Sequence, residues 1–154
     1  MPITVYWAGP LFTQAERVWN RRCVKELERK GYDVVLPQDE ARRFITPTGI
    51  DAAGIAESCY QQVIACDVVV AVLDGCDSDS GTSLEVGLRI GHMRALRLPS
   101  KVIGIRTDFR ASEDGQLNAM FRLVDGLVSF PSFEEDEAAL CVEIDTAIQR
   151  ACGL

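Results

Sequence analysis

The residues best suited to chemistry are carboxylates grouped in one stretch of the chain. Asp74, Asp77 and Asp79 lie in the glycine-bearing segment DGCDSDSG, and Glu85 follows Asp79 by six residues. Paired carboxylates in a dry cleft suit a reaction at an anomeric carbon, because one can attack or stabilise an oxocarbenium-like centre while another group assists the leaving group. Tyr6, in an apolar run near the start of the chain, carries a hydroxyl that can hold such a carboxylate.

Each of these residues also has a purely structural interpretation. Thr82 and Glu85 match the T-x-x-E capping box, in which Glu85 would only accept the Thr82 backbone N–H. The three aspartates, mixed with Gly75 and Gly81, would form a polar turn. Tyr6 would be a core side chain. At the level of sequence both interpretations stay open.

Several familiar chemistries are disfavoured. The single histidine, His92, lies deep in a predicted helix, so a Ser-His or Cys-His nucleophile is poorly supported. The glycine pattern after the first apolar run is neither GxGxxG nor a Walker loop. A calcium loop starting at Asp77 would place Leu88, not glutamate, at its twelfth position. The six cysteines form no CxxC pair or Cys/His cluster, so we expect reduced thiols and no metal site.

The composition predicts an ordinary globular chain. Its 154 residues are 47% hydrophobic and 25% charged, which predicts one domain over residues 1–154. The net charge of −7 argues against a nucleic-acid partner. No apolar run approaches the ~20 residues of a membrane span, and we see no basic-then-apolar leader. We therefore expect a cytoplasmic protein without a membrane partner.

Apolar runs and helical patterns alternate along the chain. Strands are predicted at residues 3–8, 33–36, 67–73, 101–105 and 126–130. Helices are predicted at 13–30, 51–65, 82–96 and 116–123, and a last helix capped by Ser132 with Glu134, Glu135 and Asp136 in its first turn. Residues 38–50 are expected to form an irregular functional loop.

This alternation predicts an α/β fold in a single domain. The expected architecture is a flavodoxin-like (Rossmann-like) five-stranded parallel sheet of order 2-1-3-4-5, with helices on both faces. Ligands of such sheets bind beyond the carboxyl ends of the strands, between strands 1 and 3. Residues 8–12 and 74–82 follow those two strands, so the acidic group maps onto the expected pocket.

Six segments, in order along nearly the whole chain, match one known family. They are residues 6–12 (Y-x-A-G-P-x-F), 36–37, 67–75, 79–87 (D-x-G-T-x-x-E-x-G), 105–110 and 117–120, which includes N-x-M. On these motifs the sequence resembles the nucleoside 2-deoxyribosyltransferases. The resemblance implies transfer of 2-deoxyribose between nucleobases by a retaining double displacement.

The resemblance also implies roles for individual residues. Glu85 matches the nucleophile, which attacks C1′ of a 2′-deoxynucleoside and forms a deoxyribosyl-enzyme ester. Tyr6 matches the residue that orients this nucleophile, and Asp79 matches the residue that binds the sugar hydroxyls, chiefly the 5′-OH. A carboxylate at this place would repel a 5′-phosphate, which favours nucleosides over nucleotides.

Further family positions concern the walls of the site. Gly9 and Phe12 match the pocket wall near the base. Asn118 and Met120 match a segment that closes the sugar site, often from a neighbouring subunit, so the resemblance implies a homo-oligomer. The implied partners are 2′-deoxynucleosides and free nucleobases. A carboxylate nucleophile and a nucleobase leaving group need no metal or organic cofactor.

The sequence departs from the family at the group that protonates the leaving base. Some members carry an aspartate eight residues before the position of Asp67, where this chain has Cys59. A neutral thiol is a poor proton donor to a purine nitrogen. Asp39 and Asp74 are the alternative candidates, with water as a third. Arg42 and its neighbour Arg43 are further candidates for contacting the base.

Two alternatives to the transferase stay open. The first is a hydrolase of nucleosides or nucleoside monophosphates on the same scaffold, in which water replaces the acceptor base. The second is a non-catalytic nucleoside-binding module.

Overall fold

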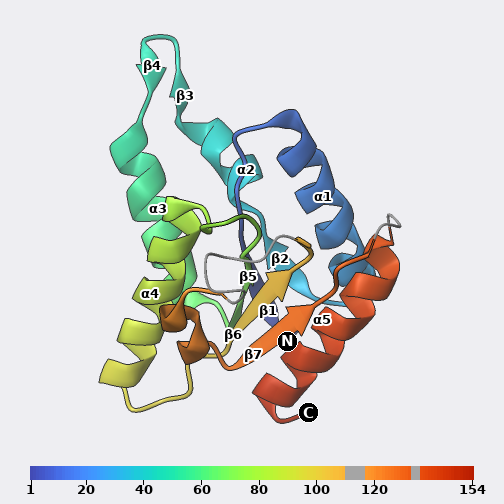
Figure 1. Cartoon of the computed structure of the whole chain (residues 1–154). Helices are drawn as coiled ribbons and strands as arrows, with labels where there is room; N and C mark the ends of the chain where they lie inside the picture. Colours follow the sequence, from blue (N-terminus) through green and yellow to red (C-terminus); the bar gives the residue numbers. More distant parts are fainter. Residues whose placement is uncertain (110–116, 133–135) are drawn as a thin grey trace.

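Five parallel strands form the central sheet of the computed structural model, which describes residues 1–109, 117–132 and 136–154 (Figure 1). In chain order they are β1 (Thr4–Ala8), β2 (Asp33–Val35), β5 (Val68–Val72), β6 (Val102–Arg106) and β7 (Gly126–Ser129). Their order across the sheet is β2-β1-β5-β6-β7. Counted by strand of this sheet, that is the predicted order 2-1-3-4-5, and the flavodoxin-like fold is confirmed.

Helices cover both faces of the sheet. Helices α1 (Gln14–Arg29) and α5 (Glu137–Cys152) lie together on one face, and α3 (Ala52–Ala65) and α4 (Ser80–Ala95) lie together on the other (Figure 1). None of the helices described is long and apolar enough to cross a membrane.

The alternation of side chains along β1 decides toward which face of the sheet each side chain points. Val5 and Trp7 pack into the core beneath α1 and α5, while Tyr6 and Ala8 pack into the core beneath α3 and α4. Successive strand residues point to opposite faces, so this division follows from the two-residue period of a strand. Tyr6 therefore faces the layer that contains α4.

The predicted irregular loop over residues 38–50 is wrong in detail. The chain forms a short helix α2 (Pro37–Glu40), a 3₁₀ helix η1 (Ala41–Phe44) and a hairpin of β3 (Ile45–Thr46) and β4 (Gly49–Ile50). Gly49 adopts a φ of 137°, and the Thr46 hydroxyl donates a 2.8 Å hydrogen bond to the Gly49 carbonyl. The hairpin pairs only with itself and projects from the end of the molecule (Figure 1).

The start of the last helix also differs from the prediction. Helix α5 begins at Glu137, and its N-cap is Asp136, whose carboxylate accepts a 2.8 Å hydrogen bond from the Ala139 N–H. Ser132 is too far before the helix to cap it. Glu134 and Glu135 lie outside the described residues. The helix predicted over 116–123 is confirmed as a 3₁₀ helix, η2 (Ala119–Leu123), while residue 116 lies outside the described part.

Candidate active site

A buried tyrosine and a carboxylate meet across the sheet and its covering helix. The Tyr6 hydroxyl donates a 2.6 Å hydrogen bond to Oε1 of Glu85. Tyr6 lies on β1 and is fully buried, whereas Glu85 lies on α4 and is half-buried. The two residues are 79 positions apart, so only the fold brings them together.

The structure rejects the capping interpretation of Glu85. Helix α4 begins at Ser80, and its N-cap is Asp79. Oδ2 of Asp79 accepts hydrogen bonds from the Thr82 N–H at 3.0 Å and from the Thr82 hydroxyl at 3.3 Å. The helix thus begins earlier than the T-x-x-E box requires, and the Glu85 carboxylate is available for another role.

The surroundings of Glu85 alter its acidity. The pKa of Glu85 is raised to about 7: burial is the largest cause, the Tyr6 hydrogen bond lowers the pKa in part, and the charge of Asp79 raises it. Burial, followed by the charge of Glu85, raises the pKa of Tyr6 far above its ordinary value, so the phenol keeps its proton and acts as a donor. Near neutral pH, Glu85 therefore exchanges between its acid and carboxylate forms.

Glu85 lies in the wall of a cavity of about 1050 Å³. The inner end, beside the sheet, includes Gly9, Cys59, Asp79, Gly81 and Thr82. The remaining wall comes from α1, α2, η1, the β3–β4 hairpin and α3, with the apolar residues Leu11, Phe12, Val18, Phe44, Ile45, Ile50 and Ile55. A cavity with a carboxylate pair at one end and apolar walls at the other suits a sugar joined to an aromatic base.

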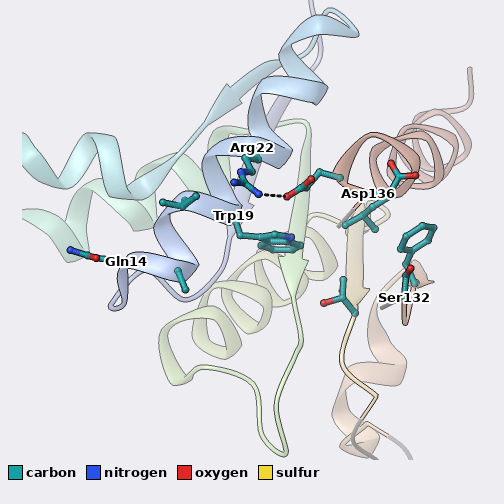
Figure 2. A pocket seen from close by; sticks show the side chains of 11 residues that line it. Gln14, Trp19, Arg22, Ser132 and Asp136 are labelled. Carbon is teal, nitrogen blue, oxygen red and sulfur yellow. Dashed lines mark hydrogen bonds and ion pairs between the residues drawn. The ribbon is translucent and has the colours of Figure 1, made fainter. Parts of the chain in front are cut away.

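A second cavity, of about 580 Å³, lies between α1 and the start of α5 (Figure 2). Its walls include Trp19, Arg22 and Asp136, and Arg22 donates a 3.2 Å hydrogen bond to Glu137. Neither Glu85 nor Asp79 lines it. The larger cavity is therefore the candidate active site.

Four of the predicted site residues, Gly9, Phe12, Asp79 and Glu85, line the candidate site. Tyr6 reaches it through its bond to Glu85. At Gly9 a Cβ atom would lie 3.0 Å from Val72 Cγ2, so glycine lets this loop approach the sheet without displacing the Val72 side chain.

Two predicted acids do not reach the cavity. Asp39 forms an ion pair with Arg21 and lines a different, smaller hollow. Asp74 accepts hydrogen bonds from the Thr107 N–H and hydroxyl, both at 2.6 Å, and so ties the end of β5 to the end of β6. Both acids are satisfied by structural partners.

Asn118 and Met120 lie apart from the cavity within this chain. The Asn118 side chain accepts a 3.0 Å hydrogen bond from the Met120 N–H and caps η2. Met120 is 68% exposed. These side chains are open to a neighbouring molecule.

Sequence reasoning missed one feature of the site and left a second incomplete. The first is the apolar wall of Phe44, Ile45 and Ile50, whose signal was three large apolar residues in a stretch treated as polar. The second is Cys59, which occupies the family's aspartate position and which the fold places in the cavity wall. Burial raises the pKa of the Cys59 thiol. Within the described residues, no group of three or more His, Cys, Asp or Glu side chains is placed to hold a metal ion.

Comparison with known families decides the membership. Residues 5–128 match the model of the family described as nucleoside 2-deoxyribosyltransferase, a span that includes Tyr6, Asp79 and Glu85. The chain belongs to the nucleoside 2-deoxyribosyltransferase family. The resemblance carried by the six sequence segments is therefore confirmed.

Solved structures share the fold of this nucleoside 2-deoxyribosyltransferase family member. A conserved protein from Enterococcus faecalis V583 is 27% identical, with a TM-score of 0.72, over 95% of this chain and 99% of its own. A 2-desoxiribosyltransferase from Leishmania mexicana is 29% identical, with a TM-score of 0.57, over 92% of this chain and 98% of its own. A CMP N-glycosidase, BcmB, from Clostridium botulinum shares the fold at 17% identity and a TM-score of 0.61, over 93% of this chain and 98% of its own. No curated protein matches the chain.

Family membership supports an enzyme that acts on the N-glycosidic bond of nucleosides, either a deoxyribosyltransferase or a related N-glycosidase.

Proposed function

We propose that this protein transfers 2-deoxyribose between nucleobases by a double displacement through Glu85. The observation that carries the proposal is the Tyr6–Glu85 hydrogen bond at the inner end of the cavity, together with the release of Glu85 from helix capping. A carboxylate held by a buried donor beside a cavity with apolar walls has the arrangement needed to attack an anomeric carbon.

In the first step an oxygen of Glu85 forms a bond to C1′ of the deoxynucleoside. The C1′–N bond breaks, and its electron pair leaves with the base. In the second step a nitrogen of an acceptor base attacks C1′ from the opposite side, the carboxylate departs, and the proton of the acceptor base passes to water. Two inversions give net retention. Tyr6 binds Oε1 of Glu85 and thereby orients the carboxylate.

Asp79 is suited to binding the sugar. Its Oδ2 is engaged by Thr82, and among the described residues no group bonds its Oδ1. We assign Oδ1 to the 5′-OH of the deoxyribose. At close range in a cavity with apolar walls, the same charge would repel a 5′-phosphate, so the proposed substrates are nucleosides.

A neighbouring subunit is proposed to complete the sugar site. The exposed side chains of Asn118 and Met120 lie outside the cavity of their own chain, and the family pattern assigns them to the sugar site. This assignment requires a homo-oligomer in which η2 of one chain covers the cavity of another.

Product analysis with and without a free base tests the proposal. We expect that a deoxynucleoside donor plus a different free base yields a new deoxynucleoside, and that the reaction depends on Glu85. Release of free deoxyribose and base without any new nucleoside would instead identify a hydrolase.

The Glu85→Gln variant removes the nucleophile but keeps a side chain that accepts the Tyr6 hydrogen bond. We expect a folded protein whose turnover falls by at least about 10³-fold. Unchanged binding of nucleosides without any turnover in either protein would identify a binding module. Full activity in the variant would contradict the nucleophilic role.

A further inference from the structure

The charges at the two ends of the cavity differ. Glu85 and Asp79 lie at the inner end, where the proposed reaction places the sugar. The base of that nucleoside then extends toward α2, η1 and the hairpin. This inference rests on the proposed function, because Glu85 fixes the position of C1′.

Within the described residues, no carboxylic acid is available at the base end to protonate a leaving base. Glu40 lines the cavity but is paired with Arg43 at 2.7 Å and lies 3.5 Å from the Gln62 amide. Asp39 is paired with Arg21 outside the cavity. Cys59 lines the wall beside Tyr6 as a neutral thiol, since burial raises the pKa of that thiol.

One cation at the base end is uncommitted. Four arginines line the cavity: Arg17, Arg21, Arg22 and Arg42. Arg17 donates hydrogen bonds to the Leu11 and Phe12 carbonyls. Arg21 pairs with Asp39, and Arg22 pairs with Glu137. In the described part of the chain, no hydrogen bond or ion pair engages the guanidinium of Arg42, which lies on η1.

We propose that the base leaves as an anion facing Arg42, and that the enzyme therefore acts on deoxynucleosides of oxo-bases, the 6-oxopurines and 2,4-dioxopyrimidines. When Glu85 bonds to C1′ and the C1′–N bond breaks, the electron pair stays on the base nitrogen. Ring conjugation spreads this charge onto the carbonyl oxygens, and water later supplies the proton.

The chemistry of the guanidinium distinguishes the two classes of base. Arginine only donates hydrogen bonds and stays charged, so it matches the carbonyl oxygens of an oxo-base anion. Adenine and cytosine instead present an amino donor to this group. They also leave best when an acid protonates a ring nitrogen, and no described side chain at the base end is available as that acid.

A donor panel tests the proposal on the intact protein. Deoxyinosine, deoxyuridine, deoxyadenosine and deoxycytidine, and their 5′-monophosphates, are each assayed with a common acceptor base, and kcat/KM is measured for the wild type and for Arg42→Gln. The matched control is Arg94→Gln, because Arg94 is an exposed arginine on α4 that does not line the cavity, whereas Arg43→Gln would free Glu40.

We expect the wild type to prefer the two oxo-base donors. Arg42→Gln should lower kcat/KM for these donors by about tenfold, less than for a buried oxyanion donor because Arg42 is exposed. It should change the values for deoxyadenosine and deoxycytidine by less than about twofold, and Arg94→Gln should leave the values for all donors unchanged. Cys59→Asp, which adds an acid to the wall, should raise the ratio of deoxyadenosine to deoxyinosine turnover.

Three results would overturn the inference without touching the proposed function. They are equal use of amino- and oxo-base donors by the wild type, an equal loss for all donors in Arg42→Gln, and a loss confined to 5′-monophosphate donors. The last would show that Arg42 binds phosphate. If instead no donor gives a Glu85-dependent product, the proposed function itself fails.

Discussion

The Tyr6 hydroxyl sets the acidity of the proposed nucleophile. Its hydrogen bond lowers the pKa of Glu85 against the opposing effects of burial and Asp79, which leaves that pKa at about 7. Tyr6→Phe removes the bond, so we expect the pKa of Glu85 to rise further. A smaller fraction of Glu85 is then ionised at pH 7, and the acidic limb of the kcat/KM profile moves to higher pH.

The control for this change is Tyr32→Phe. Tyr32 also donates its hydroxyl to a carboxylate, that of Asp145, but it lies on the opposite face of the sheet. That variant should keep the wild-type pH profile. A Tyr6→Phe profile that coincides with the wild type would contradict a role of Tyr6 in tuning Glu85.

The raised pKa of Glu85 also affects stability. The folded protein holds a proton on Glu85 up to about pH 7, whereas the carboxyl of the unfolded chain has the ordinary glutamate pKa of 4.5. The folded state therefore binds more protons than the unfolded state in that window, and the contribution of Glu85 to stability falls as pH rises through it. The Glu85→Gln side chain does not titrate, so its contribution to stability does not fall as the pH rises.

We expect Glu85→Gln and the wild type to have similar melting temperatures near pH 4.5. The advantage of the variant should grow as the pH rises to 8, because only the wild type must then bury a carboxylate. Thermal unfolding measured by circular dichroism at both pH values tests this. A constant difference between the two proteins would show that Glu85 is not the titrating group.

At the scale of elements, the first turn of α4 combines capping and binding. Asp79 satisfies the Thr82 N–H and also lines the cavity. Asp79→Asn keeps a cap but loses the charge, so we expect nearly unchanged stability and improved use of deoxynucleoside 5′-monophosphates relative to nucleosides. Asp79→Ala should in addition lower the free energy of unfolding by about 1 kcal/mol.

Asp136→Ala is the matched control, because Asp136 caps α5 in the same way and lies outside the candidate site. It should destabilise the protein without altering the preference between nucleosides and monophosphates. Chemical denaturation and the ratio of kcat/KM values measure the two effects. An unchanged preference in Asp79→Asn would remove Asp79 from the 5′ end of the sugar.

The hairpin is expected to contact the base. Ile45 and Ile50 are paired across β3 and β4, line the cavity, and are 64% and 68% exposed. Their replacement by serine should cost little stability but raise KM for donor and acceptor. Leu98→Ser, at a position that is 52% exposed and outside the cavity, is the control. Unchanged KM values in the hairpin variants would exclude this contact.

For the whole molecule, the sheet order was predictable because long apolar runs alternate with helical patterns. From spacing alone the role of Glu85 stayed open, because T-x-x-E spacing is the same whether α4 begins at Ser80 or after Thr82, and only the family motif indicated a nucleophile. Asp39 and Asp74 resemble the site acids in type, and only the fold shows their partners Arg21 and Thr107. Strands as short as those of the hairpin leave no periodic pattern to detect.

The assignment of η2 to a neighbouring cavity makes a prediction about mixed assemblies. Glu85→Gln lacks the nucleophile but keeps Asn118, and Asn118→Ser keeps Glu85 but shortens the side chain that would cover the partner's sugar site. Serine still caps η2, so folding should be preserved. In a mixed dimer, one site then combines an intact Glu85 with an intact Asn118.

Each variant alone should be nearly inactive, and an equal mixture that is allowed to exchange subunits should recover about a quarter of wild-type activity in a dimer. Half of the dimers are then mixed, and each mixed dimer has one intact site of two. The activity is measured before and after exchange, with the assembly followed by light scattering. A fully active monomer, or exchange of subunits without recovery, would show that each chain completes its own sugar site.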